Sequence, residues 1–236
     1  MYSSSPSSTT FSKSAEDQEN RMAKGWFITF EGPEGSGKTT QIALLRDYLA
    51  GLGLEVVTTR EPGGTPAGDR IRAVLLGNET GSLEPETELF LMLAQRTEHL
   101  RKVIKPAVAA GKVVLCDRYF DSSMAYQGYA RGLDPQKVRD IHAQFLPGFL
   151  PGCTVLLQIA PEHGLNRALH GGRKQHDRIE SETLDFHRRV YNGYNALAQQ
   201  EPERFVVVQA DGEPQAISQR IIEELKQRLT LPGGDK

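Results

Sequence analysis

The sequence lacks several features that would assign it to a class at once. It has only two cysteines, Cys116 and Cys153, in no CxxC or Cys/His spacing, which argues against a zinc site. Both lie in apolar runs, so we expect buried thiols in a reducing compartment rather than a disulfide. No run of about 18 apolar residues is present, and the N-terminus has no apolar signal-peptide core. These absences predict a cytoplasmic protein that does not bind membranes.

The chain also lacks an excess of positive charge. Its 28 Lys and Arg residues are outnumbered by 30 Asp and Glu residues, for a formal net charge of −2. Proteins that bind nucleic acid usually carry a basic field, so we expect no nucleic-acid partner. At 236 residues the chain is long enough to bury a large core without disulfides or a structural metal.

Composition separates the chain into a central globular part and two short ends. Residues 1–24 are rich in Ser, Thr and charge and have almost nothing to bury, so we predict a disordered N-terminal extension. Residues 25–230 are expected to form one domain, because no internal repeat or second domain is visible. Residues 231–236 are expected to be a flexible tail.

Short apolar runs alternate with helical periodicity throughout this domain. The apolar runs predict five strands, at about 26–30, 54–59, 112–116, 154–159 and 205–208. Helices are predicted at about 38–50, 66–76, 85–109, 119–129, 135–146, 162–169, 182–199 and 213–229. Near-continuous apolar strands separated by helices are typical of a parallel sheet that is covered on both faces. Ligands of such sheets bind beyond the carboxyl ends of the strands.

A phosphate-binding motif follows the first predicted strand. The sequence from Gly32 to Thr39 matches GxxxxGK[ST] between a strand and a helix, so its backbone N–H groups can surround phosphate oxygens. Lys38 can reach the β- and γ-phosphates, and the Thr39 hydroxyl can ligate Mg²⁺. We therefore predict an ATP site formed by Gly32, Pro33, Glu34, Gly35, Ser36, Gly37, Lys38, Thr39 and Thr40. The predicted fold class is α/β, a three-layer α/β/α P-loop NTPase fold with a five-stranded parallel sheet.

Charged residues follow the next two predicted strands. Arg60 follows the second strand, and its planar guanidinium suits a phosphate. Asp117 and Arg118 follow the third strand, where a carboxylate near a P-loop can orient Mg²⁺. Taken one at a time, these residues are equally compatible with a solvated arginine and a salt bridge at a helix start.

Two predicted helices carry groups that could bind a planar base. Met92 and Arg96 are four residues apart and share one helical face. Ser123, Tyr126 and Gln127 combine hydrogen-bonding groups with an aromatic ring within one turn. An ordinary helix surface is the alternative interpretation.

A basic segment with two glycines lies late in the chain. Residues 167–178 include Arg173, Lys174 and Arg178, and Gly171 and Gly172 provide a hinge. In a P-loop protein this pattern predicts a short basic lid, at about 170–180, that closes over phosphates. A solvated charge run is the simpler alternative, and nucleic-acid binding is disfavoured because no aromatic residues are interleaved with the charges.

Taken together, these motifs resemble those of thymidylate kinases of the bacterial type. The resemblance runs from about Phe27 to about Tyr194 and rests on EGPEGSGKTT, TREPGG, LAQR, DRY and SSMAYQG. It implies an enzyme that phosphorylates dTMP to dTDP with ATP and Mg²⁺, in dTTP synthesis. It also implies a homodimer, with the helix at about 85–109 as an interface element.

The resemblance further implies a role for each matching residue. The catalytic set is Lys38, Asp117, Arg118, Arg173 and Arg178, and the metal set is Thr39 and Asp117. The dTMP set is Glu34, Arg60, Met92, Arg96, Arg118, Ser123, Tyr126 and Gln127. Within it, the two arginines Arg60 and Arg118 hold the phosphate and Tyr126 lies against the sugar. Met92 stands where the family usually has a Phe that stacks on thymine, and the Glu61–Pro62 bond is expected to be cis.

Two other interpretations of the sequence stay open. A related nucleoside or nucleotide kinase with a different acceptor would share the P-loop, although TREPGG and AYQG argue against it. A non-catalytic nucleotide switch is less well supported, because the NKxD motif that reads guanine in GTPases is absent.

Overall fold

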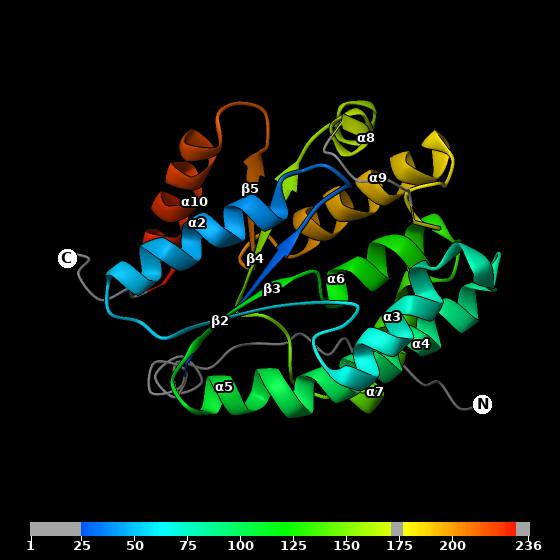
Figure 1. Cartoon of the computed structure of the whole chain (residues 1–236), viewed down its shortest axis with the longest axis horizontal. Helices are drawn as coiled ribbons and strands as arrows, with labels where there is room; N and C mark the ends of the chain where they lie inside the picture. Colours follow the sequence, from blue (N-terminus) through cyan, green and yellow to red (C-terminus); the bar gives the residue numbers. More distant parts are fainter. Residues whose placement is uncertain (1–24, 171–176, 230–236) are drawn as a thin grey trace, which may run out of the picture.

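The protein is built around a parallel sheet between two layers of helices (Figure 1). This computed structural model describes residues 25–170 and 177–229. The strands are β1 (Phe27–Glu31), β2 (Val56–Arg60), β3 (Val113–Asp117), β4 (Cys153–Gln158) and β5 (Phe205–Gln209). They lie in the order β2-β3-β1-β4-β5, and all neighbours are parallel. The predicted three-layer fold with five parallel strands is confirmed, whereas the predicted extension and tail lie outside the described residues.

The helices match the predicted positions closely. They are α2 (Lys38–Gly51), α3 (Pro66–Leu76), η1 (Asn78–Thr80), α4 (Pro85–His99), η2 (Leu100–Ile104), α5 (Lys105–Ala109), α6 (Phe120–Ser123), η3 (Met124–Ala130), α7 (Pro135–Phe145), α8 (Pro161–His170), α9 (Leu184–Gln200) and α10 (Pro214–Arg228). The segments η2 and η3 are π-helical. Each continues the α-helix before it, so the helices predicted at 85–109 and 119–129 are not regular throughout. Within the described residues, no helix combines the length and apolarity needed to cross a membrane.

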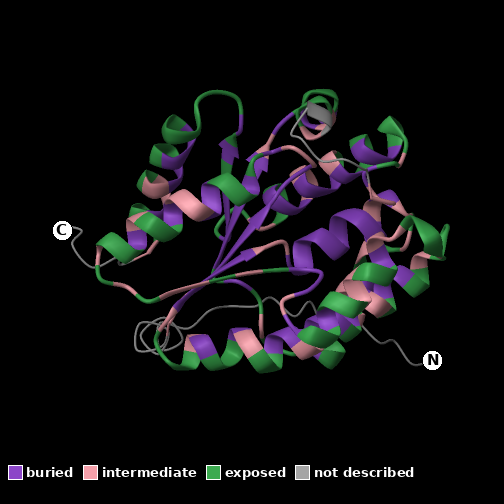
Figure 2. Cartoon of the chain, viewed as in Figure 1, coloured by how far each residue is buried: buried purple, intermediate pink, exposed green. Residues whose placement is uncertain are grey.

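Alternate side chains of the central strands enter two separate cores. On β1, Phe27 packs into one core while Ile28 and Phe30 pack into the other. Helices α2 and α10 cover the Ile28 face, and α4, α7 and α9 contribute to the core on the opposite face. Figure 2 shows the central strands β1, β3 and β4 buried and the outer sides of the helices exposed. Burial on both faces explains why the strands appear in the sequence as apolar runs rather than alternating patterns.

A buried ion pair links α6 to the residue that precedes β5. The carboxylate of Asp121 accepts two hydrogen bonds from the guanidinium of Arg204, at 2.6 and 2.7 Å. The hydroxyl of Thr154, on β4, donates to the same carboxylate at 3.1 Å. The side chains of Asp121 and Arg204 are 0% and 6% exposed, so the pair is screened from water. This contact holds the start of α6, and with it the end of β3, in a fixed position.

Removing Arg204 is expected to destabilise the fold strongly. Arg204→Ala leaves the Asp121 carboxylate buried without its cation, which typically costs about 3–5 kcal/mol. The matched control is Arg188→Ala, whose partner Glu162 is solvent-exposed, so this substitution should destabilise the fold far less. Urea denaturation of both variants measures the difference, and equal losses would contradict the role given to Asp121.

Candidate active site

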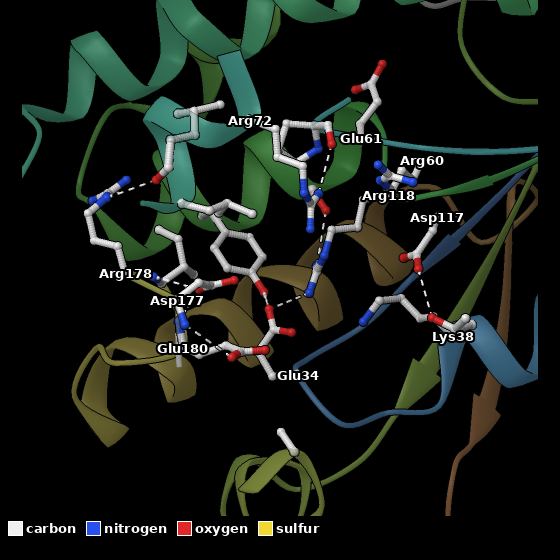
Figure 3. A pocket seen from close by; sticks show the side chains of 18 of the residues that line it. Glu34, Lys38, Arg60, Glu61, Arg72, Asp117, Arg118, Asp177, Arg178 and Glu180 are labelled. Atoms are coloured by element: carbon white, nitrogen blue, oxygen red, sulfur yellow. Dashed lines mark hydrogen bonds and ion pairs between the residues drawn. The ribbon is translucent and has the colours of Figure 1, made fainter. Parts of the chain in front are cut away.

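An open pocket of about 420 Å³ lies beyond the carboxyl ends of β1, β2 and β3. Figure 3 shows its charged side chains converging from the loop after β1, the ends of β2 and β3, and the segment that precedes α9. Most residues predicted for the site line this one pocket: Glu34, Gly35, Gly37, Lys38, Thr39, Thr40, Arg60, Met92, Asp117, Arg118, Tyr126, Gln127 and Arg178. Two predicted base-reading residues, Arg96 and Ser123, are not part of its lining.

The P-loop conformation requires glycine at two positions. Gly32 has a φ of 141°, and a Cβ there would lie 2.4 Å from the carbonyl oxygen of Leu157. Gly35 has a φ of 68°, and a Cβ there would lie 1.9 Å from the carbonyl oxygen of Gly164. L-residues rarely adopt such angles, and neither carbonyl belongs to a side chain that could turn away. Glycine at these two positions therefore follows from how the loop packs against β4 and α8.

Lys38 lies inside the loop that precedes it. Its ammonium donates hydrogen bonds to the carbonyl oxygens of Gly32 (3.1 Å) and Pro33 (3.0 Å) and to the hydroxyl of Ser36 (3.4 Å). Burial lowers the pKa of Lys38, and the nearby Arg118 lowers it further, whereas Glu34 raises it. The loop therefore holds a cation where an anionic ligand would approach.

Arg118 joins the P-loop to the end of β3. Its Nη2 donates to Glu34 Oε1 at 2.6 Å, and the Tyr126 hydroxyl donates to the same oxygen at 2.9 Å (Figure 3). The Arg118 guanidinium lies 5.0 Å from the centre of the Tyr126 ring, within cation–π distance. Burial raises the pKa of the Glu34 carboxyl, but the charges of Arg118 and Lys38 outweigh burial and lower the pKa to about 2. Glu34 is therefore ionised at any physiological pH.

Two further arginines bring positive charge to the same pocket. Arg60, at the end of β2, pairs with Asp69 at 3.2 Å and is 55% exposed. Arg72, on α3, donates to the carbonyl oxygen of Pro62 at 2.8 Å, and burial and the neighbouring Arg60 lower its pKa. Sequence reasoning missed Arg72. Its place three residues after Asp69, on the helix that follows the Arg60 loop, was the available signal.

Arg96 lies beneath the pocket rather than in it. Its side chain is fully buried and donates to Glu61 Oε2 (2.7 Å), Ser123 Oγ (3.0 Å) and the carbonyl oxygen of Tyr119 (2.8 Å). The other Glu61 oxygen contacts His99 Nδ1 at 3.0 Å. Arg96 and Ser123 are thus brought together as expected, and their reading of a base stays a prediction. The Glu61–Pro62 bond is cis, which confirms that expectation.

Glu88 organises the end of the pocket that Met92 and Gln127 line. This carboxylate is 1% exposed and accepts hydrogen bonds from Gln127 Nε2 (3.1 Å) and Arg178 Nη1 (2.7 Å). A salt bridge with Arg131 Nη2, at 2.9 Å, adds a second cation. No sequence motif marked Glu88, although an acidic residue one turn before Met92 on a predicted pocket helix was a usable signal.

The predicted lid is described only in part. Residues 171–176, which include Arg173, lie outside the described residues. Arg178 lines the pocket, where it donates to the carbonyl oxygen of Leu75 at 3.0 Å as well as to Glu88. Figure 3 shows Arg178 on the side of the pocket opposite Lys38. In this conformation its guanidinium contacts Glu88, and its predicted part in catalysis stays a prediction.

The two predicted metal ligands lie side by side. The hydroxyl of Thr39 donates to Asp117 Oδ2 at 3.4 Å, and both residues line the pocket. In the described part of the chain, no group of three or more His, Cys, Asp or Glu residues could hold a metal by itself. Mg²⁺ commonly takes one or two protein oxygens and completes its shell with phosphates and water. Thr39 and Asp117 fit that pattern.

The doubly covered parallel sheet, the P-loop and the cation-lined pocket define a P-loop nucleotide-binding protein. A profile described as thymidylate kinase matches residues 30–221. The chain belongs to the thymidylate kinase family.

Curated relatives and a solved structure agree with this assignment. The chain is 49% identical over 205 residues to a thymidylate kinase from a Synechococcus species, covering 87% of this chain and 96% of that protein. It is 48% identical over 196 residues to the thymidylate kinase of Desulfovibrio desulfuricans, covering 81% and 90%. The crystal structure of thymidylate kinase from Ehrlichia chaffeensis superposes with a TM-score of 0.70 at 31% identity, covering 86% and 99%.

The ion pair of Glu34 predicts a specific loss of stability in acid. Because its pKa is lowered from 4.5 to about 2, ionised Glu34 stabilises the fold fully above about pH 4.5, and this contribution disappears as the pH falls towards 2. A pKa difference of this size corresponds to about 3 kcal/mol in the free energy of unfolding. Glu34→Gln should therefore be less stable than the wild type at pH 6, and the gap should close towards pH 2.

Unfolding free energies measured from pH 2 to pH 6 test this expectation. The matched control is Glu203→Gln, at an exposed position before β5, which should differ little from the wild type at any pH. A Glu34→Gln deficit that stays constant over the whole range would show that the ionisation of Glu34 is not its source.

Proposed function

We propose that this protein transfers the γ-phosphoryl group of ATP to dTMP, producing ADP and dTDP for the synthesis of dTTP. The main support for this proposal is that a P-loop and a group of residues suited to a base line the same pocket. The P-loop with Lys38 lines one side, while Met92 and Gln127 line another, and Arg60, Arg72 and Arg118 bring positive charge to the same space. Such an arrangement suits two phosphorylated ligands that must meet end to end.

The reaction needs positioning and charge neutralisation more than covalent help from the protein. An oxygen of the dTMP phosphate attacks the γ-phosphorus, and the bond from that phosphorus to the β,γ-bridging oxygen breaks as ADP leaves. A phosphate monoester has a second pKa near 6, so the attacking oxygen is already anionic and needs no general base. Lys38 and Arg118 neutralise charge on the moving group, while Arg60, Arg72 and Arg118 hold the acceptor phosphate.

Thr39 and Asp117 are proposed to hold Mg²⁺. When bound, the ion neutralises charge on the β- and γ-phosphate oxygens. The contact between Thr39 Oγ1 and Asp117 Oδ2 keeps both ligands on the phosphate side of the P-loop.

The orientation of the Gln127 side-chain amide supports thymine as the base. Gln127 Nε2 donates to Glu88, and since a carboxylate only accepts, this contact sets the orientation of the amide. The opposite atom, Gln127 Oε1, is buried without a hydrogen-bond partner in the described structure. An unpaired buried acceptor is costly, and the N3–H of thymine would satisfy it. Cytosine has no hydrogen on N3, so this amide disfavours it.

The proposal also gives Tyr126 and Met92 roles in binding dTMP. Tyr126, held by Glu34, lies against the sugar and excludes a 2′-hydroxyl. Met92 packs against the base through its polarizable sulfur. A cytoplasmic homodimer is also proposed. It is supported by the buried free thiols Cys116 and Cys153 and by Phe90 on α4, which is 59% exposed.

An acceptor panel tests the proposed function. ADP formation is measured from ATP and Mg²⁺ with dTMP, dUMP, dCMP, UMP or thymidine as separate acceptors. Strong preference for dTMP is expected, with little turnover of UMP. The control variant Lys38→Ala should lower kcat by about 10² or more, because it removes charge at the transferring group. Preferred turnover of another acceptor would favour a related kinase, and no turnover would favour a nucleotide switch.

Gln127→Ala is expected to weaken the preference for thymine. The loss of one hydrogen bond should lower kcat/KM for dTMP and dUMP about tenfold. Turnover of dCMP should change less than twofold, because cytosine cannot donate from N3. Gln136→Ala, at an exposed position on α7, is the matched control. An equal loss for all three acceptors would contradict base reading by this amide.

A further inference from the structure

A buried hydrogen-bond network lies behind Arg118 and reaches the pocket lining at Ser122. At its centre is Glu31, the last residue of β1, which is fully buried. Glu31 Oε1 accepts from the backbone N–H of Tyr119 at 2.7 Å. Glu31 Oε2 accepts from the hydroxyls of Ser122 (2.7 Å) and Tyr194 (2.8 Å). One carboxylate therefore ties α9, which carries Tyr194, to the chain that follows Arg118.

The two hydroxyls face Arg118 with their oxygen lone pairs. Each hydroxyl has a single proton. Glu31 Oε2 accepts from both hydroxyls, whose oxygens also lie 2.8 Å from each other. Arg118 Nη1 donates to the Tyr194 hydroxyl at 2.9 Å and to Ser122 Oγ at 3.3 Å. A guanidinium has only donors, so it can be held only by hydroxyls whose protons point elsewhere. Glu31 meets that requirement when its carboxylate accepts the hydrogen bonds of both hydroxyls.

Arg118 is thus held from two sides. Glu34 binds Nη2 from the P-loop side at 2.6 Å, and Tyr194 binds Nη1 from the α9 side. The backbone of Arg118 has a φ of 67°, an angle that residues other than glycine seldom adopt and that persists only where surrounding contacts impose it. A neutral phenol orients the guanidinium without placing a second carboxylate against it, so the arginine keeps its attraction for phosphate.

We propose that Tyr194 is a positioning residue for phosphoryl transfer, whose hydroxyl, anchored by Glu31, holds the guanidinium of Arg118 in the orientation that receives phosphate. This role rests on the proposed function, because it acts through Arg118. Tyr194 itself is 1% exposed and is absent from the pocket lining, so it acts through Arg118.

The simpler alternative is that Tyr194 is only a core residue. Its ring packs in the core between the sheet and α9, with its centre 6.3 Å from that of Tyr126. Tyr194→Phe separates the two roles, because it keeps the ring and removes only the hydroxyl. The matched control is Tyr191→Phe, which makes the same change one turn earlier on α9 at a half-buried position that is not in the pocket lining.

The first measurement is the steady-state kinetics of both variants with dTMP and ATP. We expect Tyr194→Phe to lower kcat/KM for dTMP about tenfold, with KM for ATP and the unfolding temperature close to those of the wild type. Ser122→Ala should lose about threefold, because its contact with Arg118 is longer. Tyr191→Phe should stay within twofold of the wild type.

A double-mutant cycle shows whether the effect passes through Arg118. In an Arg118→Ala background, Tyr194→Phe should change kcat/KM less than twofold, since the group it positions is gone. A tenfold loss in both backgrounds, or none in the wild-type background, would overturn the proposal. If the wild-type enzyme itself does not phosphorylate dTMP, the proposed function fails, and the same cycle is measured with the acceptor that the panel identifies.

Discussion

The parallel alignment of all five strands is the constraint on which the rest of the molecule depends. Because every strand runs the same way, the P-loop after β1, Arg60 at the end of β2 and Asp117 at the end of β3 all reach the same edge of the sheet. The helices that return the chain then bury both faces. Residues far apart in the sequence meet at this edge as a consequence of topology, before any individual contact is considered.

The pocket at that edge gathers charged residues of both signs from several elements. Lys38, Arg60, Arg72 and Arg118 line one open space, whereas Glu34, whose pKa is about 2, is already shared between Arg118 and Tyr126. A ligand rich in negative charge would meet these four cations in one space. An acceptor phosphate and a nucleoside triphosphate together carry such negative charge, and a kinase binds both molecules.

Two buried carboxylates, Glu88 and Glu31, control the direction of hydrogen bonds at the pocket. Glu88 takes the amide N–H of Gln127 and leaves the amide oxygen as an acceptor. Glu31 takes the protons of Ser122 and Tyr194 and leaves their oxygens as acceptors for Arg118. In each case an acceptor-only group removes the choice between donor and acceptor from its neighbour. In the proposed function, selectivity for a base and orientation of a phosphate-binding arginine both depend on such a carboxylate.

The amino-acid sequence was sufficient to predict the parts of this protein that local geometry controls. The strands followed from apolar runs and the helices from periodicity. The P-loop was visible because its fixed glycines, Gly32 and Gly37, have backbone angles that other residues avoid. The tertiary structure alone decided the burial of Arg96 beneath the pocket, the π-helical turn that carries Tyr126 and Gln127, and the meeting of Tyr194 with Arg118 across 76 residues. These depend on packing between distant segments, which leaves no fixed spacing in the chain.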